Sequence, residues 1–167
     1  MMKRLFGFTM ALMLLMSLSA ARAEEGVVLT APELPEKEYI ILTEVGMKIW
    51  IPASLESEAL TAEDREDGYI AYFTGGGGTK AMAIQCFAVG KLTLEEFSEY
   101  LMDDNVETEY VTINGLRWLR YPLPENDSMS YAYSDEAVFV LEITFAPMSD
   151  AEFAALMETV LSSVQPV

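Results

Sequence analysis

The 167-residue sequence contains no histidine and a single cysteine, Cys86. Without histidine, the chain lacks the commonest general base and the commonest metal ligand, and it cannot form a Ser–His or Cys–His nucleophilic pair. One cysteine excludes an internal disulfide and a zinc site built from nitrogen and sulfur ligands. Alternation along its segment places Cys86 on the same face as Met82 and Ile84, so we expect a buried structural thiol.

Basic residues are also scarce, because 10 Lys and Arg stand against 27 Asp and Glu and give a formal net charge of −17. Such a surface repels nucleic acid and anionic lipid head groups, so we expect no nucleic-acid partner. A partner, if the surface selects one, would be a cationic protein or small ligand. The acids are scattered along the chain, and solubility alone is the simpler explanation for them.

The first 23 residues have the features of a secretory signal peptide. Lys3 and Arg4 provide a positive start, residues 5–18 form an apolar run, and Ala21 and Ala23 fit the small-x-small cleavage pattern. Removing these residues takes out three basic side chains and no acidic one, which deepens the net charge from −17 to −20. The run is shorter than the roughly 20 residues that span a bilayer, and the single cysteine lies far from the cleavage point. We therefore expect a secreted, extracellular or periplasmic protein with no membrane span and no lipid anchor.

The remaining 144 residues are enough for one domain. Residues 24–37 contain two prolines and several acids, so we expect a flexible lead-in outside the core. A single globular domain is predicted for residues 38–167. Four glycines at 75–78 precede Thr79-Lys80, but the Walker spacing is absent and a strand follows, so a hairpin tip is favoured over a phosphate loop.

Apolar periodicity predicts a mixed α+β fold. Strands are expected at residues 39–43, 47–51, 69–74, 79–89, 107–113, 116–123, 129–134 and 137–145. Capping boxes at Thr93–Glu96 and Ser149–Glu152 predict two helices, and Asn114-Gly115 predicts a tight hairpin turn. Residues 82–88 and 138–145 are apolar on both faces, which is typical of strands that are covered on both sides. We expect a largely antiparallel, twisted sheet with helices packed on its faces.

The order of these elements resembles the PsbP-like and DcrB-like α-β sandwich fold. The matching segments are Gly46–Pro52 with its terminal Ile-Pro, the helix from Thr93, the hairpin Ile113–Leu116, the strand Phe139–Phe145 and the final Leu161-Ser162-Ser163-Val164. The resemblance covers residues 38–165. It implies a three-layer sandwich with non-enzymatic accessory or binding roles, and it transfers no set of functional residues.

Carboxylates are the only abundant reactive side chains. Glu142 interrupts an apolar strand, so its carboxylate is either partly buried or directed to solvent. Calcium would suit the acidic clusters at residues 63–68, 103–105 and 125–127, although none has EF-hand spacing. A calcium-stabilised envelope module is therefore a third hypothesis, and we assign no catalytic residue, metal ligand or cofactor from the sequence.

One aromatic cluster is a candidate interaction surface. Trp118 and Arg120 share a face of one strand, and Tyr131 and Tyr133 share a face of the expected neighbouring strand. If the register aligns these faces, the four side chains form a patch of the type enriched at interaction hot spots. The alternative, which the strand spacing favours, is that the aromatic side chains are core and Arg120 extends its stem to solvent.

The leading hypothesis is an exported, non-catalytic accessory or binding domain. The signal peptide, the acidic surface, the missing catalytic residue types and the resemblance support it. The alternative is a small extracellular hydrolase that uses two carboxylates, roughly 5 to 10 Å apart, across a cleft.

Overall fold

The computed structural model describes residues 27–30, 33–34, 38–88, 90–136 and 138–167. The predicted signal peptide, including Ala21 and Ala23, lies outside the described residues. Within those ranges, no helix has both the length and the apolar character needed to cross a bilayer.

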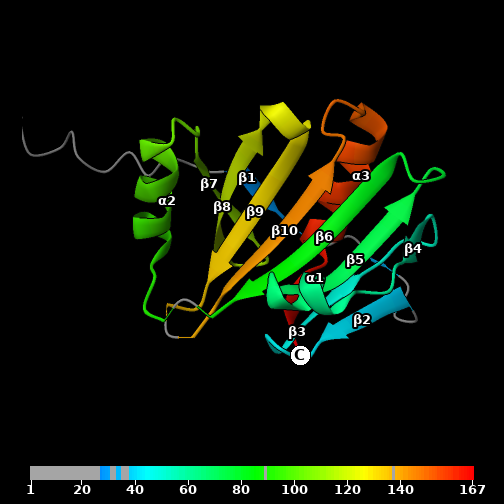
Figure 1. Ribbon diagram of the computed structural model, residues 1–167, viewed down its shortest axis with the longest axis horizontal. Helices are drawn as coiled ribbons and strands as arrows, with labels where there is room; N and C mark the ends of the chain where they lie inside the picture. The colour runs from blue at the N-terminus through cyan, green and yellow to red at the C-terminus, as the bar shows by residue number, and fades with distance from the viewer. Residues whose placement is uncertain (1–26, 31–32, 35–37, 89, 137) are drawn as a thin grey trace, which may run out of the picture.

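An eight-stranded sheet with the order β1-β7-β8-β9-β10-β6-β5-β4 forms the centre of the described part (Figure 1). Its strands are β1 (Val27–Leu29), β4 (Leu55–Ser57), β5 (Tyr69–Gly75), β6 (Lys80–Phe87), β7 (Glu109–Ile113), β8 (Leu116–Leu123), β9 (Ser128–Ser134) and β10 (Val140–Ala146). β1 pairs with β7 in parallel, and the other pairs are antiparallel. A smaller sheet has the order β11-β3-β2 and consists of β2 (Tyr39–Leu42), β3 (Met47–Trp50) and β11 (Gln165–Pro166).

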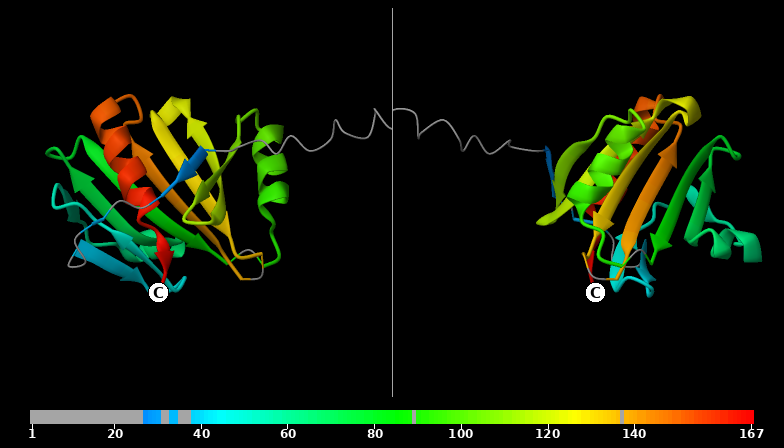
Figure 2. Two further views of the ribbon diagram at one scale, coloured as in Figure 1. Left: turned by 180° about the vertical axis from the view of Figure 1, so that it is seen from behind. Right: turned by 60° about the vertical axis from the view of Figure 1, so that its left-hand side comes forward.

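Helices cover both faces of the main sheet. The helices are α1 (Ala62–Glu66), α2 (Leu94–Asp103) and α3 (Ala151–Ser162), and a short 3-10 helix, η2 (Pro124–Asn126), links β8 to β9. We call the face that packs against α2 the front face. Figure 2 shows α3 and the small sheet on the opposite side, the back face. The molecule is therefore an α+β sandwich of three layers, as the pattern of elements predicts.

The larger core lies between the back face and the layer formed by α3 and the small sheet. It contains Trp118, Ile143, Phe153 and Ile49, each exposed by 1% or less. The smaller core lies under α2 and includes Leu119 and Tyr121. Alternation along each strand divides its side chains between these two cores.

A local signal in the sequence places the chain reversal between β7 and β8 correctly. Asn114 and Gly115 adopt φ of 48° and 80°, which confirms the tight turn between β7 and β8. The Asn114 amide Nδ2 also donates hydrogen bonds to the carbonyl oxygens of Ser162 and Val164, at 2.6 and 2.8 Å. The turn is therefore attached to the end of α3.

The two predicted capping boxes have different outcomes. The box of Thr93 and Glu96 is present at the start of α2. The box predicted for Ser149 is wrong, because Asp150 is the N-cap of α3 and its carboxylate accepts a hydrogen bond from the Phe153 amide at 2.9 Å. A carboxylate at that position satisfies the same unpaired amide group that a serine hydroxyl would.

The lead-in also contributes to the fold. Val27–Leu29 forms β1 beside β7, and Leu29 packs against the larger core. The expectation that residues 24–37 lie outside the core is therefore wrong for Leu29, whereas Val27 and Val28 are exposed although they belong to the strand. Their partner strand lies some eighty positions along the chain, at Val111–Ile113, so no local pattern identifies the pairing.

Candidate functional site

The predicted aromatic patch lies on the back face. Tyr131 stands directly opposite Arg120 in the β8–β9 register, so the faces align as the sequence suggests. Trp118 and Tyr131 are nevertheless only 0% and 2% exposed, because α3 packs over this face. The hypothesis of an exposed patch is therefore wrong for these two side chains, which belong to the core.

Arg120 and Tyr133 are the two half-buried members of the same group. Arg120 pairs with Glu109 at 3.3 Å, so its charge is already compensated. The Tyr133 ring packs on Trp118 with 5.4 Å between ring centroids and on Phe139 with 6.3 Å. These contacts tie both side chains to their neighbours in the fold.

A groove at one end of the front face brings together two acidic clusters that are twenty residues apart in the sequence. It encloses about 630 Å³ between the end of α2 and the turn that follows β8. We call it the acidic groove. Its lining residues are Asp104, Asn105, Val106, Glu107, Pro122, Leu123, Pro124, Glu125 and Asn126.

Both walls of the acidic groove are built by chain reversals. After α2, Asn105 adopts a φ of 61°, and the amide of Val106 turns back to the carbonyl oxygen of Leu101 at 3.0 Å. On the other wall, Pro124 begins η2 and Asp127 ends it with a φ of 49°. Asn and Asp tolerate this left-handed conformation better than most residues, so the local sequence fixes both turns.

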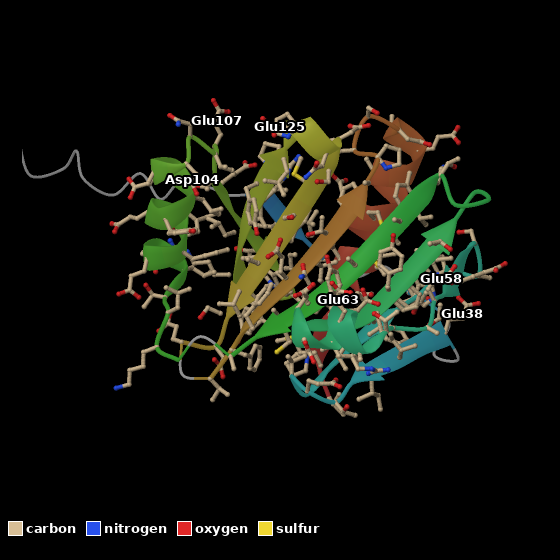
Figure 3. The ribbon with its side chains drawn as sticks, in the orientation of Figure 1. Glu38, Glu58, Glu63, Asp104, Glu107 and Glu125 are labelled. Atoms are coloured by element: carbon tan, nitrogen blue, oxygen red, sulfur yellow. The ribbon has the colours of Figure 1, made fainter. Side chains whose placement is uncertain are left out.

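The acidic groove combines an apolar floor with a charged rim. Val106 and Leu123 are half-buried and pack against the smaller core. Asp104, Glu107 and Glu125 are exposed and come from both walls (Figure 3). Throughout the described ranges, the acids found in ion pairs are elsewhere on the molecule, so no basic side chain neutralises this rim.

A larger cavity between α2 and β7 differs from the acidic groove in its charge. It encloses about 820 Å³ and is lined by Glu95, Tyr110 and Arg117, among others. Arg117 forms an ion pair with Glu95, and its guanidinium carbon lies 3.8 Å from the centroid of the Tyr110 ring. Backbone hydrogen bonding and Arg117 lower the pKa of Glu95. In this cavity, the guanidinium group of Arg117 therefore already pairs with the Glu95 carboxylate.

The acidic clusters do not assemble into a metal site. In the part of the chain that the structure describes, no three acidic side chains lie close enough to hold an ion. The first predicted cluster, residues 63–68, is largely helix α1, where the Asp64 carboxylate accepts a hydrogen bond from the Thr61 amide at 2.7 Å. The other two clusters contribute residues to the lining of the acidic groove.

Glu142 lies near the middle of the front face and is half-buried. Its Oε1 accepts a hydrogen bond from the Thr144 hydroxyl at 3.1 Å, and the Thr144 and Ser130 hydroxyl oxygens are 2.7 Å apart. The buried hydroxyl of Tyr121 also interacts with Glu142 and Ser130. Burial first, and then the negative charge of Glu142, raise the pKa of Tyr121. Two hydroxyl groups, those of Thr144 and Tyr121, therefore contact this carboxylate.

The strand register decides what stands beside Glu142. Ala132 of β9 and Gln85 of β6 are its direct neighbours on the front face. Neither is acidic, so the register does not create a carboxylate pair at this position. The acidic groove, by contrast, collects three carboxylates from two segments, and no local pattern in the sequence could reveal that convergence.

Cys86 is half-buried on β6 and is the chain's one thiol. Burial first, and then the nearby charges of Glu44 and Asp135, raise its pKa. A raised pKa disfavours the thiolate, so Cys86 does not resemble a reactive nucleophile.

Comparison with known proteins relates the chain to a fold. No protein-family model and no curated protein sequence matches it. The solution structure of cyanobacterial PsbP (CyanoP) from Synechocystis sp. PCC 6803 is similar, with a TM-score of 0.52 and 10% sequence identity over 77% of this chain and 91% of that chain. The resemblance to the PsbP-like fold predicted from the sequence is thereby confirmed, and at this identity it concerns the fold alone.

Proposed function

We propose that the chain is an exported, non-catalytic binding domain that holds a cationic partner in the acidic groove. The observation that carries the proposal is the groove itself, in which three carboxylates that form no ion pair with any described residue surround an apolar floor. Export rests on the signal-peptide features of residues 1–23. The partner is a basic segment of another protein.

The chemistry of a lysine or arginine side chain matches this site. Both side chains combine an aliphatic stem with a cationic head, so the stem would pack on Val106 and Leu123 while the head meets the rim. A volume of about 630 Å³ lies within the usual range of ligand pockets. The proposed partner therefore satisfies the apolar floor and the charged rim together.

A peptide titration tests the proposal. The probe is a capped Val-Arg-Val peptide, titrated into the protein at about 0.15 M salt, where long-range attraction is screened. Glu107→Gln and Glu125→Gln should each weaken binding by about two- to fivefold, as expected for the loss of one exposed ion pair. Glu158→Gln is the matched control, because it removes the same charge from α3 on the back face.

Two results would contradict the proposal. Equal weakening by Glu158→Gln and the groove variants would show attraction to the overall charge rather than to the groove. If the Val-Arg-Val peptide bound no more tightly than a Val-Gln-Val peptide, the proposed cation site would be ruled out.

The hydrolase hypothesis remains the second candidate, because the acidic groove is where carboxylates from separate segments meet. A screen of chromogenic glycosides and esters tests it with the same variants. Turnover that disappears in Glu107→Gln or Glu125→Gln, but not in Glu158→Gln, would replace the binding proposal with an enzymatic one.

A further inference from the structure

The two ends of α2 differ in how firmly they are attached to the sheet. The N-terminal half contains both buried residues of the helix, Leu94 and Ser98. In the last turn, Leu101 is half-buried against the smaller core, whereas Tyr100 and Met102 are 66% and 53% exposed. A segment with few buried contacts opens locally at a lower free-energy cost than the rest of a fold. The last turn is therefore the part of α2 that opens most readily.

This turn contributes to two hollows in the surface. Met102 lines the cavity of about 820 Å³ between α2 and β7. Asp104, which ends the helix, lines the acidic groove of about 630 Å³ together with Asn105 (Figure 3). Opening of the last turn would therefore move one wall of the groove, and with it one of the three carboxylates of the rim.

The charges of α2 disfavour its last turn. The carbonyl end of a helix carries a partial negative charge, so acidic side chains at that end are destabilising. α2 ends in Asp103 and Asp104, and its last turn contains no basic residue. Glu99 lies one turn before Asp103, and like charges four residues apart in a helix repel each other. A cation held in the groove would offset this excess of negative charge.

We propose that cation binding in the acidic groove is coupled to the last turn of α2: the bound cationic side chain orders this turn, and the ordered turn completes the groove. The inference rests on the proposed function and adds the regulation of the same site. The coupling is reciprocal, because a partner that stabilises the turn is itself favoured by whatever orders the turn.

Hydrogen exchange of the backbone amides, measured by mass spectrometry, tests the coupling. The probe is the capped Val-Arg-Val peptide, added at about ten times its Kd. Since the open turn lacks one wall of the groove and does not bind the peptide, exchange in residues 99–103 should slow about tenfold. Exchange in α3 should not change, because α3 lies on the back face. The Val-Gln-Val peptide at the same concentration should leave both segments unchanged.

Two variants separate the order of the helix from the charge of the groove. Asp104→Asn relieves the helix end and removes a groove carboxylate, so it should slow exchange in residues 99–103 and weaken peptide binding, each by about two- to fivefold. Glu99→Gln relieves the repulsion of Asp103 from outside the groove lining, so it should slow exchange about twofold without weakening binding. Glu158→Gln, on α3, should change neither quantity. Far-UV circular dichroism establishes that each variant is folded.

The outcomes separate this inference from the function on which it rests. If the Val-Arg-Val peptide binds but exchange in residues 99–103 does not change, the inference is overturned and the groove proposal stands. The inference is also overturned if Glu99→Gln weakens binding as much as Asp104→Asn, because charge alone would then explain both effects. If the peptide does not bind, the groove proposal fails and the inference fails with it.

Discussion

Tyr121 connects the two layers at the front of the molecule. Its ring meets the Phe97 ring of α2 edge-on, with 6.0 Å between centroids, and its hydroxyl interacts with Glu142. The sequence places Tyr121 in a strand, but it does not show that Tyr121 and Glu142 face each other. That contact depends on the register of three strands, which is set by long-range pairing.

The raised pKa of Tyr121 predicts alkaline sensitivity. Burial also raises the pKa values of Tyr131 and Tyr133. A phenol with a raised pKa in the folded state favours folding below its unfolded pKa of about 10, and this contribution is lost as the pH rises above that value. We expect the free energy of unfolding, measured with urea, to fall progressively as the pH rises above about 10.

Tyr121→Phe isolates the contribution of this residue. At pH 7 it should cost about 1 kcal/mol, because a buried hydrogen bond is lost. Above pH 10 the variant should lose stability less steeply than the wild-type protein, because one buried phenol no longer has to ionise. An unchanged slope would mean that Tyr121 is not coupled to the alkaline transition.

At the scale of elements, local chemistry predicts helices and turns better than it predicts partners. The Thr93–Glu96 box and the Asn114-Gly115 turn are visible because each involves neighbouring residues. The strand Val27–Leu29 is not visible, because it is short and pairs with a distant strand. The acidic clusters of the groove are apparent separately, but their convergence depends on where α2 ends relative to β8.

The capping box of α2 gives a prediction for this element. Thr93 Oγ1 accepts a hydrogen bond from the Glu96 amide at 3.1 Å, and Glu96 Oε2 accepts one from the Thr93 amide at 2.9 Å. Thr93→Ala should cost about 1 kcal/mol, or roughly 3 °C in melting temperature, as measured by circular dichroism.

Thr61→Ala is the matched control, because α1 has the same kind of box but buries none of its residues. The loss of that short helix should cost less, since no core packing depends on it. Equal costs for the two variants would show that α2 does not depend on its cap to pack on the sheet.

At the scale of the whole molecule, the main electrostatic feature is the excess of acidic over basic side chains. The formal net charge is −17, and the described part of the chain contains three ion pairs. Repulsion among the remaining carboxylates opposes compaction, and salt screens it. The overall sandwich was predictable, because the alternation of apolar residues reflects the layers. The distribution of charge over the faces of the sandwich was not predictable from the sequence, because it depends on which distant segments of the chain come together in the fold.

Salt should therefore raise the melting temperature at pH 7 by a few degrees between about 0.01 and 0.3 M NaCl. Near pH 4, close to the isoelectric point of about 4.1, the same addition should have little effect. Binding of the Val-Arg-Val peptide should respond in the opposite sense and weaken with salt. A melting temperature that does not change with salt at pH 7 would contradict the claim that repulsion among carboxylates destabilises the fold.

The attachment of Asn114 to the end of α3 has a consequence for ageing. An Asn residue that is followed by Gly is prone to spontaneous deamidation, which converts its side-chain amide to a carboxylate. Nδ2 donates to two carbonyl oxygens here, whereas a carboxylate can only accept and would face both of them with like charge. In the folded protein, these two hydrogen bonds hold the side-chain amide at the end of α3. After deamidation, the β7–β8 turn would be repelled from the end of α3. The attachment between the sheet and the α3 layer would therefore weaken as molecules age.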